Sequence, residues 1–122
     1  MNTIVRIRPP RAIGISDGLY SFVVQLNEPP AAYWIYAFRL ATPVGVEIDP
    51  ERVVFDPERG LLFETRESLV PGWIQHIDLW IDSANKQVAA DEAAEEKRRA
   101  EAQNREQREL LLTQVNERFK DL

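Results

Sequence analysis

The most restrictive feature of the sequence is the segment 91–109, DEAAEEKRRAEAQNREQRE, which contains no large apolar residue. A segment without large apolar side chains has nothing to bury, so it cannot form part of a packed core. It is rich in Ala, Glu, Gln, Lys and Arg, which are strong helix formers, and pairs such as Glu95–Arg99 stand at the supporting i,i+4 spacing. We therefore expect a solvated helix here, called the polar stalk.

Apolar residues return after the polar stalk, in the segment 110–122, called the apolar tip. At steps of three, four and three they are Leu112, Val115, Phe119 and Leu122, with Leu110 and Leu111 beside them. This spacing places them on one side of a helix. The equivalent positions further upstream are charged: Arg98, Glu101, Arg105 and Arg108. A long coiled coil is therefore not expected.

Upstream of the stalk, a second helical pattern begins at Pro71–Gly72. Its apolar stripe is Ile74, Ile77, Ile81, Ala84 and Val88, flanked by Trp73 and Trp80. A stripe of this width packs against a sheet. The sequence thus predicts an α+β globular domain over residues 1–83 and a C-terminal helical extension over residues 84–122.

Residues 1–83 show several β-prone runs separated by turn signals. Thr3–Arg8 is predicted to be a strand with Val5 and Ile7 facing inward, ended by Pro9–Pro10. Residues 14–18, GISDG, have the composition of a turn. Residues 19–27, LYSFVVQLN, alternate in polarity and predict a strand with one apolar face. We expect a small antiparallel sheet built from two hairpins.

The segment 30–41 is compatible with either a helix or a strand. Its aromatic and β-branched residues suit a strand. A helix is favoured, because Pro30 suits a first helical turn and Ala31, Trp34, Ile35, Phe38 and Ala41 recur at helical spacing. Four positions after Gly18 also match four positions at equal distances after Gly60, which would make each half of the domain a ββα unit. The matched pairs are Leu19 and Leu61, Pro29 and Pro71, Ile35 and Ile77, and Phe38 and Trp80.

The stretch DPERVVFDPERG, residues 49–60, repeats a charged tetrapeptide. Its Asp, Pro and Gly residues are those that turns require, so we interpret it as a strand entry at Asp49 and a hairpin turn at Asp56–Gly60. The carboxylates lack the close alternation and central glycine of a calcium-binding loop. No metal site is predicted there.

Charge and composition exclude several functional classes. The net charge is −5, and residues 12–83 carry four arginines against eleven acidic residues, which argues against nucleic acid as a partner. Arg6, Arg8 and Arg11 could contact a phosphate, but a solvated strand face explains them as well. There is no cysteine and no apolar run that could span a membrane, so we expect a cytoplasmic protein.

No constellation of residues indicates an enzyme, a metal or a cofactor. His76 is the only histidine, and it shares a helix face with no second ligand. The serines lie in no nucleophile motif, and the glycines are scattered rather than gathered in a phosphate-binding loop. We therefore expect a protein without cofactors that is not an enzyme.

Exposed apolar surface is the remaining functional signal. We predict a protein–protein interaction or oligomerisation protein, with self-association or another protein as its partner. Its candidate interface residues are Leu111, Leu112, Val115, Phe119, Leu122, Trp34, Trp73 and Trp80. For the three tryptophans, the alternative is that they only fill the domain core.

Two other functional classes remain open. The acidic balance of residues 12–83 would suit an inhibitor or immunity-type protein that binds a basic surface, such as that of a nuclease. A third possibility is a small-ligand pocket, with or without catalysis, beneath Trp34 and Trp73, although no polar residues converge there in the sequence.

Overall fold

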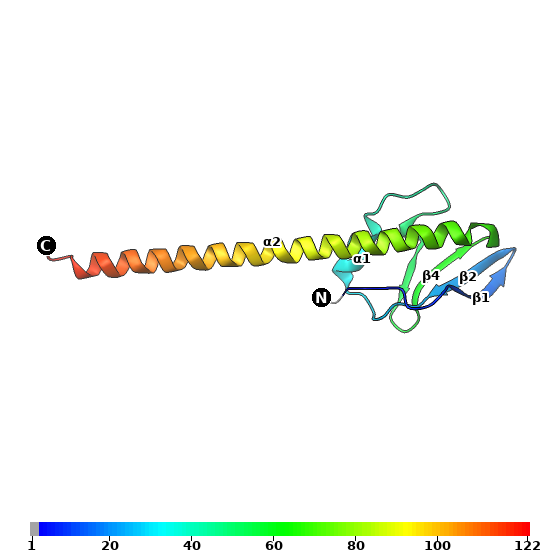
Figure 1. Cartoon of the computed structure of the whole chain (residues 1–122), viewed down its shortest axis with the longest axis horizontal. Coiled ribbons are helices and arrows are strands. Elements are labelled where there is room, and N and C mark those ends of the chain that lie inside the picture. Colours follow the sequence, from blue (N-terminus) through cyan, green and yellow to red (C-terminus); the bar gives the residue numbers. More distant parts are fainter. Residues whose placement is uncertain (1–2) are drawn as a thin grey trace. The chain divides into compact units, whose positions relative to one another are not determined.

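The computed structural model describes residues 3–122, which form a four-stranded antiparallel sheet, a short helix and a long C-terminal helix (Figure 1). The elements in chain order are β1 (Arg11–Ser16), β2 (Leu19–Val24), α1 (Ala32–Arg39), η1 (Pro50–Arg52), β3 (Val54–Asp56), β4 (Gly60–Thr65), η2 (Glu67–Leu69) and α2 (Val70–Arg118). The strand order in space is β1-β2-β4-β3. This architecture confirms the predicted α+β class.

The chain divides into two compact units, and the boundary falls after Val88. The first unit holds the sheet, α1 and the first part of α2. The second unit, Ala89–Leu122, holds the rest of α2. Ala84 and Val88 are buried in the first unit, so its core reaches a few residues beyond the predicted boundary at residue 83.

The core of the first unit lies on one face of the sheet, along which the first part of α2 runs (Figure 1). The predicted stripe on α2 is confirmed, since Ile77, Ile81, Ala84 and Val88 are all buried. Trp73 and Trp80 do not flank this stripe but belong to it, because both indoles are buried as well. Ile74 is only partly buried at its edge.

The first hairpin turns within the predicted segment 14–18, but its first strand differs from the predicted one. Asp17 and Gly18 both have positive φ, as a tight two-residue hairpin turn requires, and they connect β1 to β2. The partner of β2 in this hairpin is therefore Arg11–Ser16, and the prediction of a strand over Thr3–Arg8 was wrong. Those residues are extended but make only one isolated bridge, Arg6↔Leu26.

The alternation predicted for Thr3–Arg8 was also wrong. Ile4 is fully buried, whereas Val5 and Ile7 are about half exposed. Arg6 turns toward α2, where its guanidinium forms two hydrogen bonds of 2.9 Å with the Asp78 carboxylate. This bond raises the pKa of Arg6 above its ordinary value. Ile4 and Arg6 therefore share the side of the segment that contacts α2, and Val5 and Ile7 share the exposed side.

The ambiguous segment 30–41 forms a helix, α1, as predicted. Pro29 and Pro30 precede it, and the chain enters the helix through Ala31 in an extended conformation. Trp34, Ala37 and Phe38 are buried on its inner side. Ile35 is partly buried against the core, whereas Tyr33, Tyr36 and Leu40 are exposed.

The repeated tetrapeptide forms turns, as predicted. Asp49 accepts a hydrogen bond from the Glu51 backbone N–H at 2.9 Å and caps η1. Asp56 accepts bonds from the backbone N–H groups of Glu58 (2.8 Å) and Arg59 (3.2 Å), which lower the pKa of its carboxyl group. Gly60 then adopts a φ of 113° and starts β4.

Asn85 on α2 ties three segments of the first unit together. Its Oδ1 accepts hydrogen bonds from Trp34 Nε1 at 2.8 Å and from the Ile4 backbone N–H at 3.1 Å. Its Nδ2 donates to the Ile4 carbonyl oxygen at 2.8 Å. The side-chain amide therefore pairs with the Ile4 backbone as a neighbouring strand would, and it holds the N-terminal segment and α1 against α2.

The order of elements repeats, since a hairpin and a helix occur twice: β1-β2-α1 and β3-β4-α2. The residue alignment that indicated a duplication does not preserve burial. It matches Leu19, which is 38% exposed, with Leu61, which is fully buried. In the β2–β4 ladder Val24 is the direct partner of Leu61. The repeat is therefore one of element order and not of side-chain environment.

Candidate functional site

The three tryptophans predicted as interface residues lie inside the core. Trp34 and Trp73 are fully buried and Trp80 is 4% exposed. Trp73 stacks on Phe63 with ring centroids 4.9 Å apart, and Trp80 meets Phe38 edge to face at 5.7 Å. These contacts support the alternative that the tryptophans close the core, because a buried ring offers no surface to a partner.

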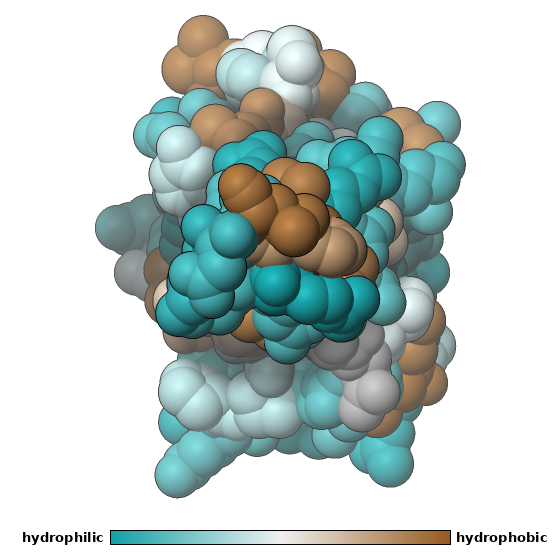
Figure 2. Space-filling view, turned by 90° about the vertical axis from the view of Figure 1, so that its left-hand side faces the viewer, coloured by the Kyte–Doolittle hydropathy of each residue, from teal (hydrophilic) through white to brown (hydrophobic). Residues whose placement is uncertain are grey.

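The other predicted interface residues are exposed. Within the second unit, the helix α2 runs through most of the apolar tip, and the Phe119 backbone N–H still bonds to the Val115 carbonyl oxygen at 3.3 Å. Each large apolar side chain of the tip has 44% or more of its surface exposed: Leu110, Leu111, Leu112, Val115, Phe119 and Leu122. Figure 2 shows hydrophobic surface gathered on one side of the chain end, beside hydrophilic surface.

The polar stalk is solvated along its whole length, since every residue from 91 to 109 is exposed. The predicted pair Glu95–Arg99 forms with an N–O distance of 3.6 Å, and Glu95 also contacts Arg98 at 2.9 Å. Such exposed pairs each contribute roughly 0.3–0.5 kcal/mol to a helix. Within the second unit, the apolar tip is therefore the only part with a continuous apolar surface among the described residues.

His76 has a structural role on α2. Its Nδ1 lies 2.7 Å from the Gly72 carbonyl oxygen, one helical turn earlier, and its ring is tilted against Trp80. Among residues 3–122, no three His, Asp or Glu side chains lie close enough together to hold a metal ion. No helix in this described part of the chain is both long and apolar enough to cross a membrane.

The N-terminal arginines separate into two groups in the structure. Arg6 is held by Asp78, as described above. Arg8 and Arg11 instead lie on the other face of the sheet, where they line a groove together with Arg59 from the β3–β4 turn. Sequence reasoning did not identify this group, because the three residues come from three separate segments.

Comparisons of the chain with protein-family models, with curated proteins and with solved structures returned no match.

Proposed function

We propose that the chain is a non-enzymatic protein–protein interaction protein that self-associates through its apolar tip. The observation that carries this proposal is the exposure of all six large apolar side chains of residues 110–122, of which Leu110, Leu111, Leu112 and Val115 lie on α2 and Phe119 and Leu122 follow its end. Contiguous exposed apolar surface of this kind marks interaction sites in proteins. The proposed partner is a second copy of the chain.

The spacing of the apolar residues supports self-association. Leu112, Val115, Phe119 and Leu122 follow the three-four spacing of a helix–helix seam, and such a seam is complementary to itself. The seam ends at Arg108, where charged residues take over the equivalent positions. Pairing is therefore confined to about two heptads.

The energetics predict a concentration-dependent equilibrium. Burial of a large apolar side chain contributes roughly 1.5–3 kcal/mol when it starts fully exposed. The tip side chains start about half exposed, so a pair of seams gains about 8 kcal/mol. Association costs roughly 4–15 kcal/mol, which is of the same order. We therefore expect a weak complex or a bundle of more than two helices, and not a permanent dimer.

The test is the molar mass of the full chain, measured by light scattering over a series of concentrations. We expect the mass to rise above that of a monomer as the concentration increases. Deletion of residues 109–122 should abolish the rise, and so should the double substitution Leu112→Glu with Phe119→Glu, which places charges in the seam.

The matched control is Thr113→Glu with Gln114→Glu. It adds the same charge to the apolar tip but outside the seam, so self-association should persist. A monomeric mass for the full chain at every concentration would refute the proposal. Equal loss of association in the control and in the seam variant would show that net charge, and not the seam, controls the mass.

A further inference from the structure

The sheet has a second face that α1 and α2 do not cover. In β2 and β4, Val24, Leu61 and Phe63 face the core, so their neighbours Val23 and Leu62 face the other way. The register aligns one row of side chains across all four strands on this open face: Val54, Leu62, Val23 and Arg11. The row is aliphatic over three strands and ends in a guanidinium on β1.

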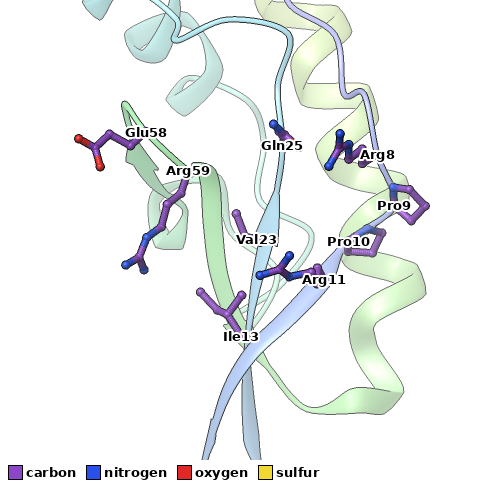
Figure 3. Close-up of a pocket in the computed structure, with 9 residues that line it drawn as sticks. All are labelled: Arg8, Pro9, Pro10, Arg11, Ile13, Val23, Gln25, Glu58 and Arg59. Carbon is purple, nitrogen blue, oxygen red and sulfur yellow. The ribbon is translucent and has the colours of Figure 1, made fainter.

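A groove of about 760 Å³ lies beside this row on the open face. Its apolar lining includes Ile13 and Val23, and its wall includes Pro9 and Pro10 (Figure 3). Gln25 adds a polar group at the end where β2 has stopped. The groove therefore combines apolar and polar lining residues.

Three arginines from three different segments line this groove. Arg8 comes from the extended N-terminal segment, Arg11 from β1 and Arg59 from the β3–β4 turn. Glu58 is the only acidic residue of the lining, and Figure 3 shows its carboxylate pointing away from Arg8 and Arg11. The groove thus carries net positive charge in a chain whose net charge is −5.

The guanidinium groups of this groove are available to a ligand. Among the described residues 3–122, no carboxylate forms an ion pair with the side chains of Arg8, Arg11 or Arg59. Arg59 lowers the pKa of the Asp56 carboxyl group through the hydrogen bond of its backbone N–H and, to a smaller extent, through the charge of its side chain. Arg6, by contrast, is fully engaged by Asp78. The three groove arginines have the free donors that bind carboxylates in a bidentate manner.

We propose that this groove binds an acidic segment of a partner protein, with its carboxylates on Arg8, Arg11 and Arg59 and its aliphatic side chains on Val23 and Ile13. Charge complementarity requires an anionic occupant, and the aliphatic lining favours side chains over bare phosphates. Nucleic acid fits poorly, because no aromatic side chain in the lining could stack on a base.

The experiment uses the full chain and a fluorescein-labelled peptide that alternates glutamate and valine, with fluorescence anisotropy as the readout. We expect binding that weakens as salt is added, because the arginines are exposed and their charges are screened. Arg11→Glu and Arg59→Glu should each weaken binding roughly tenfold, since an attraction becomes a repulsion. Arg11→Lys should retain part of the affinity, because it keeps the charge but loses the planar fork.

Arg52→Glu is the matched control. It makes the same charge change on η1, in the same unit but outside the groove lining, so the affinity should stay within about twofold. Circular dichroism of each variant verifies that its fold is retained. The amide resonances of Ile13, Val23 and Gln25 should shift when the peptide is added.

Three outcomes would overturn the proposal: no binding of the glutamate–valine peptide, equal weakening by Arg52→Glu and Arg11→Glu, or tighter binding of a single-stranded oligonucleotide than of the peptide. A lysine–valine peptide and inorganic phosphate complete the comparison, and both should bind more weakly. The seam variant Leu112→Glu with Phe119→Glu should bind the peptide normally. This result separates the groove from self-association, so either proposal can fail without the other.

Discussion

At the scale of single residues, Asn85 on α2 stabilises the first unit through hydrogen bonds to two other segments. Trp34 and Ile4, its two partners, are fully buried, so their bonded N–H groups cannot turn to water if Asn85 is lost. An unsatisfied buried polar group costs roughly 1–3 kcal/mol. The amide of Asn85 is therefore a polar contact on which the packing of the N-terminal segment depends.

We predict that Asn85→Ala lowers the free energy of unfolding by about 2–4 kcal/mol, because several polar groups lose their partner together. Urea denaturation followed by tryptophan fluorescence measures this loss. The exposed neighbour Ser83→Ala is the control and should change stability by less than about 0.5 kcal/mol.

A double-mutant cycle with Trp34→Phe assigns part of this loss to the bond between Asn85 and the indole. In the Asn85→Ala background, Trp34→Phe should be less costly than in the native chain, because the indole N–H has already lost its acceptor. Equal costs in the two backgrounds, or an Asn85→Ala effect no larger than the control, would contradict this role for Asn85.

Residue patterns alone could not predict this contact or the ion pair of Arg6. Asp78 stands 72 positions from Arg6 in the chain, and Asn85 stands 81 positions from Ile4. Alternation in Thr3–Arg8 is compatible with either set of side chains facing inward. The choice depends on contacts with distant residues, including the burial of Ile4 in the core, which explains why the predicted orientation of Val5 and Ile7 was wrong.

At the scale of elements, local sequence patterns were sufficient to predict the turns and the helices. Each of these elements is specified by neighbouring residues: the Asp-Pro-Glu-Arg repeat for the turns, the proline pair for the start of α1, and the apolar stripe for α2. The first strand of the first hairpin was assigned to the wrong residues because β1 has no buried residue and so lacks a strong apolar pattern. It forms through the Asp17–Gly18 turn and its register with β2.

Two glycines in the hairpin turns provide a matched prediction. Gly18 has a φ of 78° with open space around it, whereas Gly60 has a φ of 113° and a Cβ there would lie 2.4 Å from the Val24 carbonyl oxygen. We predict that Gly18→Ala costs about 1–2 kcal/mol, which is the penalty of the left-handed backbone alone.

Gly60→Ala should cost at least about 3 kcal/mol, since the backbone penalty is joined by a collision that requires β2 and β4 to separate locally. Thermal denaturation of both variants measures the difference. Equal losses of stability would show that the backbone at residue 60 moves freely, contrary to the packing described.

At the scale of the whole molecule, the two proposed interaction surfaces differ in how far the sequence predicts them. The apolar tip is a continuous segment, so its spacing was visible directly and its exposure in the structure agrees with it. The groove requires Arg8, Arg11 and Arg59 to meet, which depends on the pairing of β1 with β2 and on the turn before β4. No local pattern contains that information.

Self-association through the apolar tip is the central functional proposal. Hydrogen exchange of backbone amides, followed by mass spectrometry at low and high protein concentration, tests it most directly, because it locates the protected residues. An isolated helical segment with no buried face frays, so the amides of residues 110–118 should exchange quickly in the dilute monomer.

We predict that protection over residues 110–118 rises with concentration, while protection over residues 77–84, in the core of the first unit, stays constant. The seam variant Leu112→Glu with Phe119→Glu should show no such rise. Exchange over residues 110–118 that is the same at both concentrations, or a rise confined to another segment, would contradict the account.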